Sequence, residues 1–155
     1  MAIVSPHALP QKRVVIAASQ EDVLRGLRLY CVENNHFSVV GLALTSEALL
    51  QDIATHTPEA AVIHCDLAGS EMMNILRRIR EQSPSTAIIA IGDYTVPSLV
   101  NLALRSGAQG YLLVMPLKQQ LAAALDVVCS GHFVLDEQLK YLLPLLKSAL
   151  TPHLV

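Results

Sequence analysis

The chain has 155 residues, of which 52% are hydrophobic and only 15% are charged, and its formal net charge is -2. This length suits one domain with its own hydrophobic core, and the near-neutral charge argues against a basic nucleic-acid-binding surface. No apolar run reaches the roughly 18 residues that a transmembrane helix needs, so we expect no membrane contact.

Short apolar runs rich in β-branched residues alternate with helical patterns along the whole chain. The predicted strands are 13–18, 38–43, 60–65, 86–91 and 109–114. The predicted helices lie near 20–34, from Ser46 to before Pro58, over 71–82, from Thr95 to Gly107, and over 117–130. Each strand is an almost continuous apolar run, so both faces of the sheet should be covered. Five strand–helix units predict a doubly wound, five-stranded parallel α/β sheet.

The expected organisation is a flexible lead-in (1–12), one domain (13–135) and a C-terminal linker or dimerisation helix (136–155). The lead-in lacks the charged start and apolar core of a signal peptide. The tail sequence "DEQLKYLLPLLKSAL" predicts an extra helix over 136–150, strained by Pro144. The three cysteines are scattered through apolar segments, which favours buried free thiols in a reducing cytoplasm.

Several motifs point to one family. They are "EDVLRGLRLY" (21–30), "SPSTAIIAIG" (83–92) and, most specifically, "LALRSGAQGYLL" (102–113), with "PEAAVI" and "ILRRIRE" at matching spacing. Over roughly 13–135 the chain resembles the CheY-like receiver domain of bacterial response regulators, and among these the NarL/FixJ subfamily. The resemblance implies a flavodoxin-like sheet with strand order 2-1-3-4-5 and a role in two-component signal transduction.

The family's phosphorylation site is replaced in this chain. A working receiver needs an acidic pair, an acceptor aspartate, a hydroxyl and a lysine at the carboxyl ends of its strands. By resemblance these positions fall on Ala18, Ser19, His64, Gly92 and Val114. Mg²⁺ requires hard oxygen ligands, and without the metal a transferring phosphoryl group lacks charge neutralisation. We therefore expect a degenerate receiver with no catalytic residue, no metal and no cofactor, which is not an enzyme.

Two residues near the former acceptor leave alternatives open. His64 either fills the emptied acidic pocket or accepts a phosphoryl group or a metal ion. Asp66 lies on the same strand face, two residues on, and is the residual acceptor if the alignment shifts. A structural zinc site with His64 would need four ligands. Tyr111 occupies the family's switch-aromatic position, where we expect a fixed packing role.

The resemblance implies the regulatory and dimerisation part of a transcriptional regulator. In the NarL/FixJ subfamily a helix-turn-helix domain follows the receiver, and residues 136–155 are too few to form one. DNA would then be bound only through a domain absent here. The alternatives are a stand-alone adaptor that contacts a regulatory protein and a receiver that senses a small ligand through the emptied pocket.

A homodimer is expected from three features. The charge content is well below the ~25% of an average soluble domain, and residues 96–128 carry few charges. Leucines also recur at helical spacing in the tail, at Leu139, Leu142, Leu143, Leu146 and Leu150. Such a stripe is either shared with a second copy, which we favour, or packed back on the domain.

Overall fold

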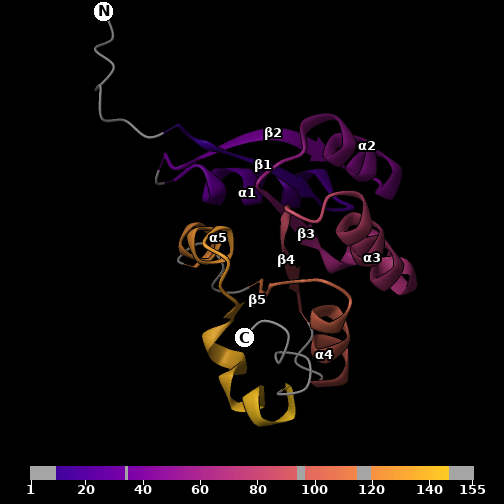
Figure 1. Cartoon of the computed structure of the whole chain (residues 1–155), viewed down its shortest axis with the longest axis vertical. Helices are drawn as coiled ribbons and strands as arrows, with labels where there is room; N and C mark the ends of the chain where they lie inside the picture. The colour runs from indigo at the N-terminus through magenta and orange to yellow at the C-terminus, as the bar shows by residue number, and fades with distance from the viewer. Residues whose placement is uncertain (1–9, 34, 94–96, 115–119, 147–155) are drawn as a thin grey trace, which may run out of the picture.

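A six-stranded parallel sheet, ordered β2-β1-β3-β4-β5-β6, forms the centre of the fold (Figure 1). The structure is a computed structural model that describes residues 10–33, 35–93, 97–114 and 120–146. The strands are β1 (Lys12–Ala17), β2 (Phe37–Ala43), β3 (Ala60–His64), β4 (Ala87–Gly92), β5 (Gly110–Leu113) and β6 (Val134–Leu135). The α-helices are α1 (Glu21–Cys31), α2 (Ser46–His56), α3 (Met72–Gln82), α4 (Pro97–Arg105) and α5 (Leu121–Cys129). The 3₁₀ helices are η1 (Cys65–Leu67), η2 (Gly69–Glu71) and η4 (Glu137–Leu142).

The predicted parallel α/β class and the order of the first five strands are confirmed, but the predicted strand count is wrong. Val134 and Leu135 form β6, which pairs in parallel with Gly110 and Tyr111. A strand this short carries no periodic signal that sequence analysis could recognise. β1 begins at Lys12, the last residue of the expected lead-in.

Helices cover both faces of the sheet, as the continuous apolar strands predict. Buried side chains of α1 and α5, among them Leu27 and Leu125, form one core with β1 residues such as Ile16. Buried side chains of α2, α3, α4 and the tail form the second core on the opposite face. The sheet is therefore enclosed between two apolar layers, and its carboxyl edge stays available for polar groups.

The segment after β6 is not the continuous helix predicted over 136–150. It is the 3₁₀ helix η4 followed by helical residues at 143–146. The buried Asp136 carboxylate sets this geometry, because it accepts backbone N–H bonds from Leu113 and Gln138, both at 2.9 Å. These two bonds cap η4 and tie its start to β5, so the chain turns back onto the domain.

The leucine stripe mostly faces the chain's own core, which corrects the expected shared interface. Leu139, Leu142 and Leu146 are buried in the core that includes Leu104 and Tyr111. Leu143 is partly exposed, and Leu150 lies outside the described residues. Helical spacing identifies an apolar stripe but not the surface that covers it, and here the domain itself covers three of the five leucines.

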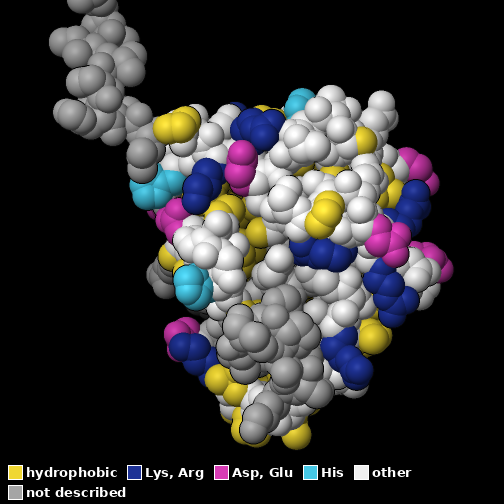
Figure 2. All heavy atoms as spheres, viewed as in Figure 1, with side chains coloured by type: hydrophobic (Ala, Val, Ile, Leu, Met, Phe, Trp, Pro, Cys, Tyr) yellow, Lys and Arg dark blue, Asp and Glu magenta, His cyan; other side chains and the backbone are white. Residues whose placement is uncertain are grey.

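The surface seen in Figure 2 carries charges of both signs, interspersed rather than gathered into one patch. Exposed apolar side chains of the tail are Tyr141, Leu143 and Leu145, and hydrophobic atoms appear at the lower end of the same view. Among the described residues no helix combines the length and the hydropathy of a membrane span.

Candidate functional site

The carboxyl ends of β1, β3, β4 and β5 meet at one edge of the sheet. The parallel register pairs Ala17 with Ile63, His64 with Ile91 and Gly92 with Leu113. This register brings the five expected positions to the same edge, namely Ala18, Ser19, His64, Gly92 and Val114. These positions therefore share one sheet edge, and the chemistry there depends on the side chains that occupy it.

A polar cluster of Ser19, Asp66 and His64 stands at this edge. The Ser19 hydroxyl donates to Asp66 Oδ2 at 2.7 Å, and the Ser19 backbone N–H lies 3.4 Å from Asp66 Oδ1. His64 Nδ1 lies 2.9 Å from Asp66 Oδ1, with the imidazole largely buried. Asp66 thus links the end of β3 to the loop after β1, and both of its carboxylate oxygens are engaged.

His64 Nδ1 has two neighbours that require different protonation states. It accepts the Asp66 backbone N–H at 3.2 Å when it carries a lone pair. It donates to the Asp66 carboxylate at 2.9 Å when it carries a proton. The two bonds are therefore alternatives, and either one holds the imidazole against the loop after β3.

The Asp66 carboxylate is stabilised in its charged form. Partial burial by itself would raise its pKa, but the hydrogen bonds from Ser19 and the nearby His64 outweigh that effect and hold the pKa below its ordinary value. The contribution to stability is present above the unfolded-state pKa of an aspartate and is lost as the pH falls through the lowered folded-state pKa. At neutral pH the Asp66 carboxylate is therefore ionised, and contacts from Ser19 and His64 engage both of its oxygens.

Two of the other positions that the resemblance assigns to phosphorylation-site groups are apolar. Ala18 is fully buried, and Val114 packs against the same core as α1 and α5. Neither side chain supplies an oxygen ligand or an amine. Among the described residues no group of three or more His, Cys, Asp or Glu side chains is placed to hold a metal ion. The donor set at this edge does not fit Mg²⁺, which needs several oxygen ligands around one point.

Gly92 and Tyr111 fit together in a way that sequence analysis did not foresee. Tyr111 is buried with only 1% of its surface exposed. A Cβ atom added at Gly92 would lie 2.6 Å from the Tyr111 hydroxyl oxygen and 3.4 Å from Cys65 Sγ. The absent side chain at position 92 therefore provides the space that the tyrosine hydroxyl occupies.

Cys65 belongs to this packing unit. Burial raises the pKa of its thiol to about 12, although a hydrogen bond with Tyr111 acts in the opposite direction. Sequence analysis treated the cysteines only as buried free thiols. The strand register could have indicated the contact between Tyr111 and Gly92. Tyr111 pairs with Ala90, and Ala90 lies on the same face of the sheet as Gly92.

Comparison with known proteins gives a consistent result. Residues 14–126 match the model of the response regulator receiver domain family. The transcriptional regulatory protein NarL of Mycobacterium tuberculosis is 27% identical over 135 residues, which is 84% of this chain and 61% of NarL. The chain therefore spans less than two thirds of the length of that relative.

Solved structures share the fold. The isolated receiver domain of RcsB from Salmonella enterica serovar Typhimurium, determined with the phosphomimetic BeF3-, superposes with a TM-score of 0.77 at 21% identity. That match covers 86% of this chain and 99% of the RcsB domain. A structure of two RcsB dimers bound to two parallel DNAs gives a TM-score of 0.77 at 22% identity, over 86% of this chain and 68% of that chain.

Proposed function

Because the chain belongs to the response regulator receiver domain family, we propose that it is a receiver that acts without aspartate phosphorylation, as the regulatory part of a transcriptional regulator. The observation that carries this proposal is the Ser19–Asp66–His64 cluster, in which a serine and a histidine occupy positions where the family has acids. A receiver with this cluster presents a protein-contact surface to its partners and has no phosphorylation switch.

The oxygen ligands, the hydroxyl and the lysine that a working receiver needs act at different steps of phosphoryl transfer. Without a set of oxygen ligands, Mg²⁺ does not bind tightly enough to neutralise the charge of the transferring group. Without a hydroxyl at Gly92 and an amine at Val114, a phosphorylated state gains no contacts that the unphosphorylated state lacks. A modification without differential contacts shifts no conformational equilibrium.

Asp66 is the alternative acceptor, and its surroundings argue against that role. Its Oδ2 accepts the Ser19 hydroxyl, and its Oδ1 faces His64 Nδ1. Attack on a phosphodonor would require breaking at least one of these contacts. Position 114, directly after β5, holds a valine, whose side chain cannot take up the charge of the product.

We expect no phosphorylation when the chain is incubated with acetyl phosphate and Mg²⁺, and no binding of beryllofluoride. Intact-mass spectrometry and calorimetry measure the two results, and the isolated RcsB receiver domain serves as the positive control. His64→Asp alone should also stay unmodified, because the groups missing at Ala18, Ser19, Gly92 and Val114 are still missing. A stoichiometric adduct on Asp66 or His64 of the unmodified chain would overturn the proposal.

The second part of the proposal is that the chain forms a homodimer. The tail leucines give this part little support, because three of the five are buried in the chain's own core. RcsB forms dimers on DNA, and exposed apolar side chains remain here on α1 and α5, at Leu29 and Val127. We expect a dimer at tens of micromolar chain in multi-angle light scattering. A monomer at that concentration would contradict this part and leave the phosphorylation argument intact.

A further inference from the structure

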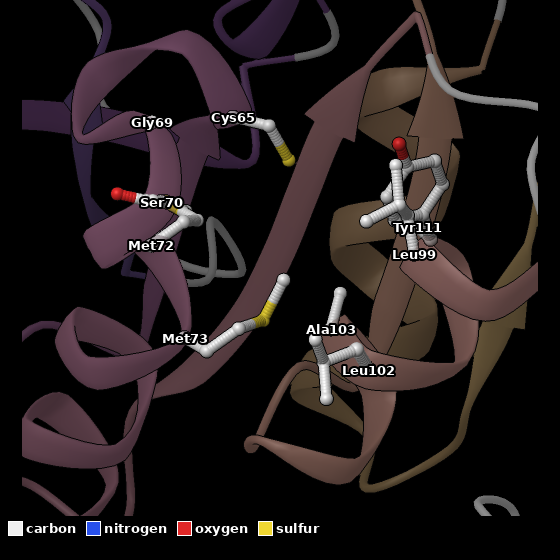
Figure 3. A pocket seen from close by; sticks show the side chains of 9 residues that line it. All are labelled: Cys65, Gly69, Ser70, Met72, Met73, Leu99, Leu102, Ala103 and Tyr111. Atoms are coloured by element: carbon white, nitrogen blue, oxygen red, sulfur yellow. The ribbon is translucent and has the colours of Figure 1, made fainter.

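A cavity of about 280 Å³ opens between the loop after β3 and the helix α4. Figure 3 shows Cys65 and Met73 on one side of it, and Tyr111, Leu99, Leu102 and Ala103 on the other. The cavity lies on the face of the sheet covered by α3 and α4. It is separate from the Ser19–Asp66–His64 cluster, none of whose members line it.

The small, buried side chain of Ala103 forms part of the cavity wall. The inner face of α4 buries Val100, Ala103 and Leu104, and Ala103 faces the flexible Met73 across the gap (Figure 3). A larger residue at position 103 would fill the gap, as core positions between packed helices usually do. Methionine adapts its shape to different contents, which suits a cavity that exchanges a ligand.

The lining excludes charged ligands. No charged side chain contributes to it among the described residues. The Ser70 hydroxyl points away from the space between the helices (Figure 3). Burial raises the pKa of the Cys65 thiol to about 12, so this group is neutral at physiological pH. Nucleotides and phosphorylated metabolites would lose hydration here without gaining a partner, and water would find few hydrogen-bonding groups.

We propose that this cavity binds an uncharged, mainly hydrocarbon small molecule, from the size of two fused rings or a medium-length alkyl chain up to that of a naphthalene that carries one phenyl ring. An apolar cavity of roughly 150 Å³ accommodates benzene, so a cavity of about 280 Å³ has room for a larger molecule of this class. Leu99 and Leu102 are partly exposed at its mouth, and a bound ligand would cover them. The ligand would also contact Tyr111, and so reach the packing unit of Tyr111, Gly92 and Cys65.

The test uses two probes with the same ring skeleton and different charge. We expect the neutral dye N-phenyl-1-naphthylamine to bind with saturable, one-to-one fluorescence enhancement. The sulfonated dye 1-anilinonaphthalene-8-sulfonate should bind at least tenfold more weakly. 1-Octanol, which is uncharged, should compete with the neutral dye. Equal binding of both dyes, or no saturable binding of the neutral one, would overturn the proposal.

Two variants test whether the neutral dye binds in this cavity. Ala103→Phe fills the cavity and should weaken binding of the neutral dye at least tenfold, with the fold checked by circular dichroism. Leu102→Trp blocks the mouth from a partly exposed position and should act similarly even if Ala103→Phe fails to fold. The matched control is Leu42→Trp on the edge strand β2, because Leu42 is exposed and does not line the cavity. Binding that is unchanged in Leu102→Trp would contradict the assignment.

This inference is tested independently of the proposed function. Dye binding does not depend on whether the carboxyl edge accepts a phosphoryl group. A failed phosphorylation prediction would leave the cavity result unaffected, and a failed dye experiment would leave the Ser19–Asp66–His64 argument unaffected.

Discussion

Leu139→Glu is expected to unfold the domain, and not to dissociate a folded dimer. Leu139 is fully buried in the core that holds Leu142, Leu146 and Tyr111. A carboxylate at this position would lose its hydration, and the described side chains of the core around it are apolar. Uncompensated burial of a charge ranks among the largest single-residue effects, at about 4 kcal/mol or more. Total stabilities of about 5–15 kcal/mol leave little margin for such a loss.

Urea denaturation followed by circular dichroism measures this effect. The matched control is Leu145→Glu in the same segment, because Leu145 is 65% exposed and should tolerate the charge with little change in midpoint. A Leu139→Glu variant with the unmodified midpoint would show that the tail is not part of the core. A variant that stays folded but changes from dimer to monomer would restore the interpretation of the stripe as a shared interface.

The tail illustrates where sequence analysis succeeds and where it stops. The apolar residues of 136–150 were identified, but an apolar stripe looks the same whether the chain or a partner buries it. The decisive feature is the buried Asp136 carboxylate, which bonds the N–H of Leu113 on β5. A single aspartate at the start of a predicted helix gives no indication that its partner lies on a distant strand.

At the carboxyl edge, too, the positions of the residues can be predicted from the sequence but their contacts cannot. Topology alone places the ends of β1, β3 and β4 together, so the positions of Ser19, His64 and Gly92 could be predicted from the strand pattern. Their contacts could not be predicted, because the bond from Ser19 to Asp66 depends on side-chain geometry in the loop after β3. These contacts engage both oxygens of Asp66, and the sequence gives no sign of them.

Gly92→Ala is expected to destabilise the domain through a clash with Tyr111. The new Cβ atom would lie 2.6 Å from the tyrosine oxygen, closer than any van der Waals contact allows. The ring is rigid and buried, so relief requires it to turn away from β4 or the strands to shift. Overpacking of this kind costs about 1–3 kcal/mol.

A double-mutant cycle identifies the clashing atom. Tyr111→Phe removes the hydroxyl oxygen that the new Cβ atom would contact, so Gly92→Ala should cost less in that background. The coupling between the two positions should reach about 1 kcal/mol, within the range for residues in direct contact. Urea unfolding of the four proteins measures it. Gly26→Ala serves as control, since nothing lies within 4 Å of a Cβ atom there and alanine favours the helix α1.

The same cycle bears on how the receiver works. If the cost of Gly92→Ala falls in the Tyr111→Phe background, the space above Gly92 holds the tyrosine hydroxyl in the folded domain in solution. The ring is then held inward by packing against Gly92 and Cys65, with no phosphoryl group needed to place it. Equal costs in both backgrounds would mean that Tyr111 does not occupy this space. The inward ring would then have to be explained by some other contact, and the fixed packing role would fail.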